Sequence, residues 1–196
     1  MIPLPAPTLH SAIRFIAEKH DGQFRKAKTV IRLPYFFHQM QVTRALYDLG
    51  LHESEHLTVL LATLGHDTLE DTSCTYDELK EAIGQAAADI VVELTFDPQK
   101  MSKSEYMATF GTKSVEALVI KIQDRLCNCR DFWKSGDKEY ALKYFLKADP
   151  IWDAFEQRKQ EIQDKFGDKF WNRLRASIEI DRQLLTTFDK RRLKGE

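Results

Sequence analysis

Four side chains that could bind a hard cation lie together in the stretch GHDTLEDT: His66, Asp67, Glu70 and Asp71. An adjacent His and Asp place an imidazole nitrogen and a carboxylate oxygen about 100° apart around a helix, so both can turn toward one cation. Two further carboxylates follow within the next turn and would repel each other unless a cation or a cationic substrate lay among them. The stretch therefore predicts metal-assisted chemistry.

Ligands from other parts of the chain are needed to complete such a site, because one short segment cannot surround a cation without strain. His38, at the start of an expected helix, and Asp124, an acid among apolar residues, are the two candidates. Taken singly, each is as readily explained as a core histidine or a buried, hydrogen-bonded acid. Their order along the chain around the His66-Asp67 pair favours a shared site.

A second stretch, residues 52–56, fits the H-E-x-x-H pattern of zinc metalloproteases. That pattern needs both histidines on one face of a continuous helix. Gly50 and Ser54 indicate that a helix begins between His52 and His56 instead. We interpret the stretch as a polar surface turn.

The elements that must position these residues are predicted to be helices. Only 8 Gly and 6 Pro interrupt a chain whose apolar residues recur mostly at helical spacing, so the fold class predicted is all-α. Residues 75–78 have the form of a capping box that opens a short helix. The expected helices cover residues 9–20, 38–49, 54–66, 76–83, 85–95, 102–110, 114–131, 138–147, 150–166 and 168–190. We expect a single domain over residues 1–196, with a core at about 9–147 and C-terminal helices at about 150–190.

Composition narrows the class of protein. A length of 196 residues, 43% hydrophobic content and a net charge of −1 describe one globular core without the basic excess of a nucleic-acid binder. No apolar run is long enough to span a membrane and the N-terminus lacks the pattern of a signal peptide, so a cytoplasmic location is expected. Cys74, Cys127 and Cys129 are expected to be reduced thiols, since their number is odd and their spacing fits neither a disulfide framework nor structural zinc.

The ordered pattern H…HD…D resembles the HD-domain superfamily of metal-dependent phosphohydrolases. The stretch HDTLEDT is similar to the signature of the alarmone hydrolases, namely the SpoT/Rel hydrolase domain and the small stand-alone metazoan SpoT homologues. Residues 23–26, 34–38, 120–128 and 144–145 resemble the same family in the same order, so the likeness extends over residues 9–145. Several ordered motifs are far more specific than an HD pair alone.

The resemblance implies one Mn²⁺ ion, held by His38, His66, Asp67 and Asp124. Glu70 and Asp71 would orient and deprotonate the attacking water and manage the proton of the leaving group. This division of work is chemically coherent, because the cation lowers the pKa of a bound water while carboxylates supply general acid and base.

The same resemblance implies contacts to a purine nucleotide. Arg25 would stack on the purine, for which its planar guanidinium is suited. Lys26 would face the nucleotide and its phosphates, and Asn128 and Tyr144 would contact the sugar or base. The implied reaction is hydrolysis of the 3′-pyrophosphate of (p)ppGpp with release of pyrophosphate, by a hydrolase without a synthetase half.

Two departures from the family pattern bear on this reading. The sequence AKTVIRL replaces a shorter polar loop after Lys26, so an adenosine alarmone, (p)ppApp, stays open as the substrate. Gly65 stands where the family carries an apolar residue, which is expected to alter packing more than chemistry. Two further functions also stay open: a phosphatase acting on NADPH or a deoxynucleoside triphosphate, and a catalytically silent nucleotide-binding module. The oligomeric state is not indicated.

Overall fold

The computed structural model describes residues 6–25 and 32–194, and the elements in these ranges are helices apart from one isolated antiparallel bridge between Phe24 and Pro34. The prediction of an all-α fold is confirmed. The described residues group into two compact units, which are residues 6–25 with 32–101 and residues 102–194. The expectation of a single domain over residues 1–196 stays a prediction.

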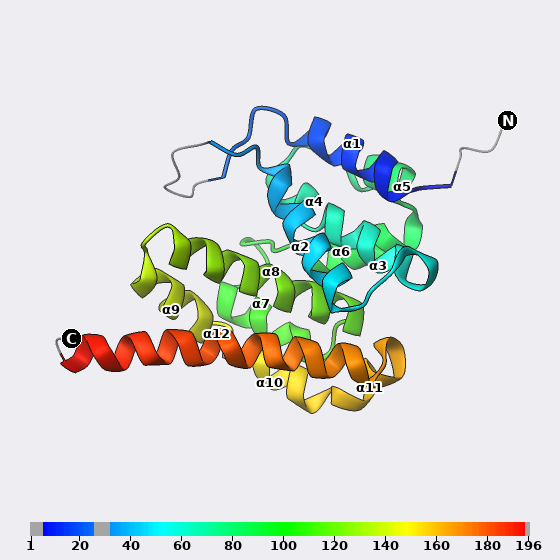
Figure 1. The fold of residues 1–196 in the computed structure, drawn as a ribbon. Coiled ribbons are helices and arrows are strands. Elements are labelled where there is room, and N and C mark those ends of the chain that lie inside the picture. The colour runs from blue at the N-terminus through cyan, green and yellow to red at the C-terminus, as the bar shows by residue number, and fades with distance from the viewer. Residues whose placement is uncertain (1–5, 26–31, 195–196) are drawn as a thin grey trace, which may run out of the picture. The chain divides into compact units, whose positions relative to one another are not determined.

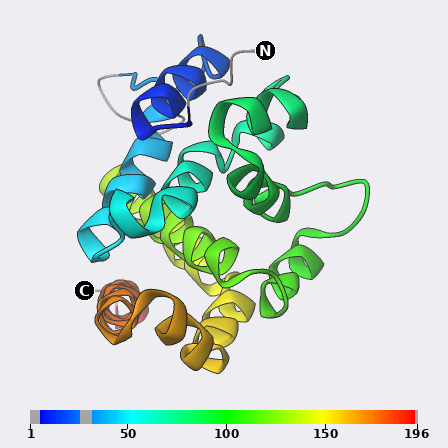
Figure 2. The same ribbon diagram turned by 90° about the vertical axis from the view of Figure 1, so that its right-hand side faces the viewer.

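The first unit is arranged around one central helix. Its helices are α1 (Leu9–Lys19), α2 (Phe36–Leu49), α3 (Glu53–Gly65), α4 (Thr68–Asp71), α5 (Tyr76–Ile83) and α6 (Gln85–Leu94). Helix α3 contacts α1, α2, α5 and α6 (Figures 1 and 2), and its residues 59–65 are all buried. The segment that leads to His66 is therefore fixed from several sides.

Gly65 closes α3 at a point of near contact with two neighbouring helices. A Cβ atom there would lie 3.1 Å from Cδ1 of Ile83 on α5 and 3.3 Å from Cγ2 of Val91 on α6. Such distances are shorter than ordinary van der Waals contact between carbons. The glycine thus allows the last turn of α3 to pack closely, which agrees with the expectation that this departure concerns packing.

Side-chain caps define the starts of two helices in this unit. Thr75 accepts a hydrogen bond from the Glu78 amide, and the Glu78 side chain accepts one from the Thr75 amide, so the predicted capping box is confirmed. Thr8 and Ser11 form an equivalent pair at the start of α1. Each pair satisfies backbone donors that an α-helix leaves unbonded at its N-terminus.

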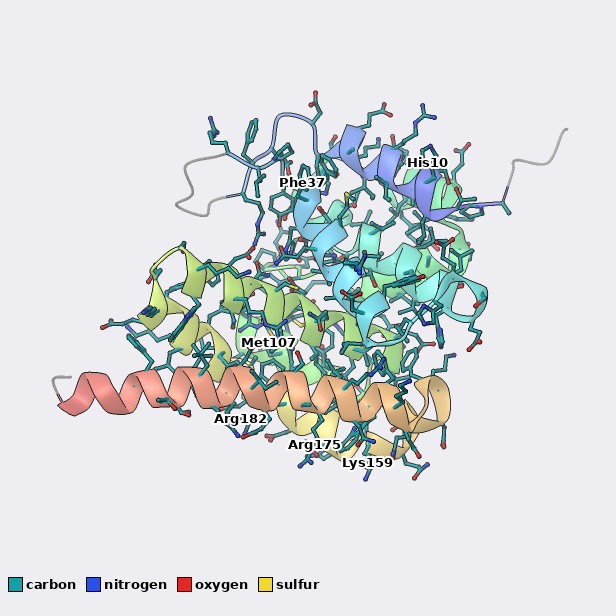
Figure 3. The ribbon with its side chains drawn as sticks, in the orientation of Figure 1. His10, Phe37, Met107, Lys159, Arg175 and Arg182 are labelled. Carbon is teal, nitrogen blue, oxygen red and sulfur yellow. The ribbon has the colours of Figure 1, made fainter. Side chains whose placement is uncertain are left out.

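The helices of the second unit pack around α8. Its elements are α7 (Lys103–Ala108), a short 3₁₀ turn (Thr109–Gly111), α8 (Val115–Lys134), α9 (Lys138–Leu146), α10 (Asp149–Gln157), α11 (Lys159–Phe166) and α12 (Asp168–Lys194). Helices α9, α10 and α12 all contact α8 (Figures 1 and 2). Trp171 of α12 stacks on Phe155, and the cations of Lys159 and Arg175, labelled in Figure 3, lie 4.7 Å and 5.4 Å from its ring centroid.

Apart from shifts of a few residues at helix ends and the 3₁₀ turn after α7, the structure differs from the predicted helices at two places. The helix expected over residues 150–166 breaks at Arg158, whose φ is −98° and ψ is 22°. Its guanidinium donates to the Lys113 carbonyl at 2.5 Å and to the Phe110 carbonyl at 3.3 Å. Both carbonyls belong to residues more than 40 positions earlier in the chain. The second difference is α4, a single turn that the sequence pattern did not indicate.

No helix among the described residues is both long enough and apolar enough to cross a bilayer.

Candidate active site

The path of the chain from α3 into α4 places His66 and Asp67. His66 follows the last residue of α3, and its Nδ1 lies 2.7 Å from the carbonyl oxygen of Thr63, one turn earlier. A carbonyl can only accept, so Nδ1 carries the proton and donates it. The lone pair of Nε2 is then directed away from the helix backbone, which is the arrangement that metal-binding histidines commonly have.

Three of the four predicted metal ligands meet in the first unit. Nε2 of His66 lies 3.2 Å from Oδ2 of Asp67, and Nε2 of His38, at the start of α2, lies 3.9 Å from the same oxygen. One ligand atom from each residue lies within 4.8 Å of the other two. Both imidazoles are buried, and Asp67 is partly exposed. Two imidazole nitrogens and one carboxylate oxygen at these separations suit a divalent cation such as Mn²⁺ or Zn²⁺.

Tyr35 connects one predicted metal ligand, Asp67, with one predicted catalytic acid, Asp71. Its hydroxyl lies 3.0 Å from Oδ2 of Asp67 and 2.8 Å from Oδ2 of Asp71. Burial raises the pKa of the Tyr35 phenol, and the negative charges of Asp67 and Asp71 raise it further. The phenol therefore stays protonated at neutral pH and serves as a donor between two carboxylates.

Glu70 and Asp71 are exposed acids on α4 that are oriented by different groups. Oε2 of Glu70 accepts a hydrogen bond of 3.0 Å from the backbone amide of Phe96. The Asp71 carboxylate accepts from Tyr35, and its backbone amide donates to the Asp67 carbonyl at 2.9 Å. The one-turn helix α4 thus carries both carboxylates, of which that of Asp71 shares the Tyr35 hydroxyl with Asp67.

Arg25, predicted to stack on the purine, lies in the segment between α1 and α2. The Arg25 guanidinium lies over the ring of Tyr35, 5.6 Å from its centroid. The Arg25 amide donates to the Leu33 carbonyl at 3.0 Å, so this part of the loop is paired with the segment ahead of α2. Lys26 lies outside the described residues, and its role stays a prediction.

The fourth predicted ligand, Asp124, belongs to the second unit. It is a buried residue of α8 whose Oδ2 lies 3.1 Å from the Lys121 ammonium. Its Oδ1 accepts a hydrogen bond of 2.6 Å from the side-chain amide of Asn128, one turn later. Asn128, predicted to contact substrate, is thus a partner of Asp124. The metal-binding role of Asp124 stays a prediction.

Tyr144, on α9, is a partner of Arg125. The Arg125 guanidinium lies 3.5 Å from the centroid of the Tyr144 ring, and Nη2 donates to the Tyr144 carbonyl at 2.5 Å. Burial raises the pKa of the Tyr144 phenol to about 12. These contacts explain the position of the aromatic ring within the second unit, and a contact with substrate stays a prediction.

The rejected zinc-protease pattern at residues 52–56 is interrupted as predicted. His52 precedes α3, and His56 has non-helical angles of −126° and 24° within it. The two imidazoles therefore do not share one face of a regular helix.

Cys74, Cys127 and Cys129 are unbridged and buried, as expected for reduced thiols. Burial raises the pKa of Cys127 to about 11 and the pKa of Cys129 to about 12.

Tyr35 is a residue of the candidate site that reasoning from spacing did not select. It entered the sequence interpretation only as part of the stretch ahead of His38. A tyrosine three positions before a candidate histidine ligand is a weak signal, because aromatic residues at such positions are usually core residues. Its importance comes from Asp71, which lies 36 positions later in the chain.

No protein-family model matches the chain. The MESH1 protein of Xenopus tropicalis, named guanosine-3′,5′-bis(diphosphate) 3′-pyrophosphohydrolase, is 36% identical over 173 residues, a match that covers 84% of this chain and 94% of that protein. The human protein of the same name is 35% identical, and the match covers 86% of this chain and 96% of that protein. An Aquifex aeolicus protein with the same activity name is 34% identical, but this match covers only 18% of its length.

A solved structure of a metazoan orthologue of SpoT, described as hydrolysing ppGpp, has a TM-score of 0.69 to this chain at 24% identity. The match covers 92% of this chain and 98% of the other. At this level of identity the likeness establishes the common fold.

Proposed function

Because this chain belongs to the family of SpoT-like guanosine-3′,5′-bis(diphosphate) 3′-pyrophosphohydrolases, we propose that it hydrolyses the 3′-pyrophosphate of a purine alarmone and releases pyrophosphate. The substrate is (p)ppGpp or its adenosine counterpart (p)ppApp. The observation that carries this proposal is the grouping of His38, His66 and Asp67 with Asp71, which one phenol links to Asp67.

The residues proposed to hold the cation are His38, His66 and Asp67, with Asp124 as a fourth ligand. When bound, the proposed Mn²⁺ ion lowers the pKa of a water ligand and neutralises phosphate charge. The donor set favours a divalent cation of this kind, since it combines imidazole with carboxylate. His66 is prepared for the role by the hydrogen bond from its Nδ1 to Thr63, which leaves Nε2 as the ligand atom.

The two acids of α4 manage the protons of the reaction. Asp71 takes a proton from the attacking water, and the Tyr35 hydroxyl holds its Oδ2 in place while it does so. The bond between the 3′ oxygen of the ribose and the neighbouring phosphorus breaks, and its electron pair stays with the 3′ oxygen. Glu70, oriented by the Phe96 amide, enters the step protonated and gives its proton to this oxygen. Asp71 then loses its new proton to solvent, and Glu70 takes one up before the next turnover. The water oxygen stays on the pyrophosphate, and ppGpp gives GDP as the second product.

The nucleotide contacts proposed are those of Arg25, Lys26, Asn128 and Tyr144. For Arg25 the supporting observation is its place over the Tyr35 ring, where one face of a planar guanidinium packs on an aromatic group and the other can meet a purine. A cytoplasmic location and the lack of nucleic-acid and membrane partners stay predictions from the sequence.

A substrate panel tests the proposal directly. The purified chain with Mn²⁺ is offered ppGpp, ppApp, NADPH and a deoxynucleoside triphosphate, and the products are identified by ion-exchange chromatography. Pyrophosphate released from an alarmone supports the proposal. Orthophosphate from NADPH or triphosphate from the deoxynucleotide, without alarmone cleavage, would replace it with the alternative phosphatase function.

Two matched variants make this test specific for the site. Asp71→Asn removes the proposed base, and Asp77→Asn makes the same change at an exposed acid on α5. Loss of turnover in the first variant only is expected. No turnover of any nucleotide by the wild-type chain with bound metal would favour a silent nucleotide-binding module.

A further inference from the structure

His20, a buried histidine that is not among the predicted site residues, contacts two side chains that hydrogen-bond to Asp71, those of Gln23 and Tyr35. His20 follows the last residue of α1 and has an exposed fraction of only 1%. A buried imidazole needs partners for both ring nitrogens, since an unbonded polar atom in the interior costs about 1 to 3 kcal/mol. The partners of His20 are all side chains close to the proposed catalytic acid or to a metal ligand.

The first connection runs through Gln23 to the backbone of Asp71. The Gln23 amide nitrogen donates a hydrogen bond of 2.8 Å to the carbonyl oxygen of Asp71. Its amide oxygen lies 2.8 Å from Nδ1 of His20 and accepts from it. His20 thereby fixes the orientation of the Gln23 amide, because a rotated amide would present oxygen to the Asp71 carbonyl.

The second connection runs through Tyr35 to the side chain of Asp71. The His20 and Tyr35 rings are stacked, with centroids 5.1 Å apart and an interplanar angle of 23°. The Tyr35 hydroxyl contacts Oδ2 of Asp71 at 2.8 Å, and the Tyr35 amide donates to the Gln23 carbonyl at 2.9 Å. Both the backbone and the carboxylate of Asp71 therefore rest on residues that pack against His20.

The other ring nitrogen anchors His20 to α2. Its Nε2 shares a hydrogen bond of 2.9 Å with the side-chain amide of Gln39, which is fully buried and follows the proposed ligand His38. The imidazole is thus held at three points: two hydrogen bonds and one stacked ring. Side chains that are locked in this way can hold a catalytic group to within a fraction of an ångström.

We propose that His20 is a positioning residue for Asp71, acting through Gln23 and Tyr35 without touching the substrate. The catalytic part of this proposal rests on the proposed function. Loss of the His20 hydrogen bonds loosens the segment that carries Asp71, and the rate of the proton transfer falls while substrate and metal binding are retained. A change of about 10- to 100-fold in kcat is expected, as for other residues that orient an active group through a second side chain.

The test compares three variants with the wild-type chain. His20→Phe keeps the stacked ring and removes both hydrogen bonds, and Gln23→Met removes the donor to the Asp71 carbonyl at a half-buried position. Thr8→Ala weakens the opposite end of α1 by removing its N-terminal cap and serves as the control for a general loss of stability. Each is measured for kcat, KM, Mn²⁺ affinity, melting temperature and hydrogen–deuterium exchange in residues 67–72.

The proposal predicts faster exchange in residues 67–72 and a lower kcat for His20→Phe and Gln23→Met, with KM and Mn²⁺ affinity within about threefold of wild type. Thr8→Ala should keep both exchange in this segment and kcat. Unchanged exchange in folded His20→Phe and Gln23→Met would overturn the proposal. If the wild-type chain does not cleave alarmones, the proposed function fails, and the exchange measurement still decides whether His20 holds this segment.

Discussion

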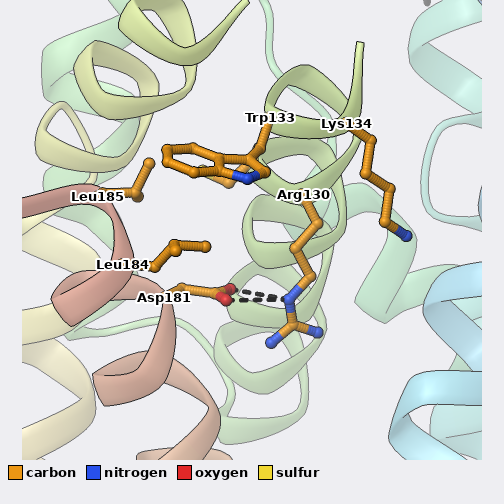
Figure 4. Close-up of a pocket in the computed structure, with 7 residues that line it drawn as sticks. Arg130, Trp133, Lys134, Asp181, Leu184 and Leu185 are labelled. Atoms are coloured by element: carbon orange, nitrogen blue, oxygen red, sulfur yellow. Dashed lines mark hydrogen bonds and ion pairs between the residues drawn. The ribbon is translucent and has the colours of Figure 1, made fainter. Parts of the chain in front are cut away.

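Two aspartate groupings in this protein are held in opposite ways. In the first unit, Asp67 and Asp71 approach one neutral hydroxyl, that of Tyr35, at 3.0 Å and 2.8 Å. In the second unit, Asp181 of α12 is paired with a cation, since both of its oxygens lie within 3.2 Å of Nε of Arg130 on α8 (Figure 4). A guanidinium neutralises a carboxylate, whereas a phenol orients it and leaves its charge in place.

The surroundings of Asp181 agree with a structural role. It lines a cavity of about 150 Å³ between α8 and α12, together with Trp133, Leu184 and Leu185 (Figure 4). Burial raises the pKa of Asp181, and the positive charge of Arg130 opposes that rise. The carboxylate of Asp181 is thus matched by a guanidinium within the fold, whereas Asp67 and Asp71 share contact with the neutral hydroxyl of Tyr35.

The largest effect is expected for the substitution Asp71→Asn, which should lower the rate of catalysis. Removing the proposed general base should lower kcat by about 10² to 10⁴. The free energy of unfolding should not fall, because one of two neighbouring negative charges is removed. Steady-state alarmone hydrolysis and urea unfolding measure the two quantities. A kcat within tenfold of wild type would remove Asp71 from the mechanism.

Tyr35→Phe should have the next largest effect. The variant keeps the ring that stacks on His20 and removes only the donor shared by Asp67 and Asp71. We expect kcat to fall about 10- to 100-fold, with a smaller loss of Mn²⁺ affinity, because the hydroxyl orients rather than reacts. Kinetics at saturating Mn²⁺ provide the check, and a wild-type rate would mean that the two carboxylates hold their positions without the phenol.

Asp181→Ala tests the other side of the comparison. It leaves Arg130 without its carboxylate in a partly buried position, where the Arg130 side chain is 36% exposed. The free energy of unfolding should fall by about 1 to 3 kcal/mol, less than for a fully buried pair. Turnover per folded molecule should stay within about twofold of wild type. Loss of turnover in folded Asp181→Ala protein would contradict the division of roles.

The smallest effect concerns Glu78, an exposed carboxylate in the first unit that is paired with the Lys19 ammonium at 2.6 Å. A hydrogen bond from Lys19, followed in importance by one from the Thr75 amide, lowers the pKa of Glu78 to about 2. A lowered folded-state pKa means that the stabilisation is fully present above about pH 4.5, the ordinary value for a glutamate, and is lost as the pH falls toward 2. The difference in melting temperature between wild type and Glu78→Gln should therefore shrink between pH 6 and pH 3. A difference independent of pH would indicate that Glu78 acts only through its size and hydrogen bonding.

Local signals in the sequence were sufficient for most of the fold. The capping box at Thr75 and the glycines after residues 83 and 166 mark helix ends that the structure has. Helix periodicity did not reveal the break at Arg158, whose guanidinium bonds two carbonyls that lie 45 and 48 positions away in the chain. The single turn of α4 was missed for a related reason, since four residues are too few to show a helical period.

For the candidate site, too, local sequence signals indicated some residues and not the contacts that depend on distant parts of the chain. Residue types and order were enough to select His38, His66 and Asp67, which the structure brings together. Nothing local indicated that Tyr35 would reach Asp71 or that Gln23 would reach its carbonyl, because these contacts span 36 and 48 positions of the chain. Long-range hydrogen bonds of this kind are set by how the helices pack.

We propose that the grouping of His38, His66 and Asp67 holds a divalent cation for the hydrolysis of an alarmone. The most direct measurement is pyrophosphate release from ppGpp or ppApp as Mn²⁺ is titrated into metal-free wild-type, Asp67→Asn and Asp181→Asn proteins. We predict that wild type and Asp181→Asn reach full activity at about one ion per chain, as for a single metal site. Nucleoside diphosphate and pyrophosphate should form in equal amounts. Metal-independent release, or an Asp67→Asn protein that titrates like wild type, would contradict the account.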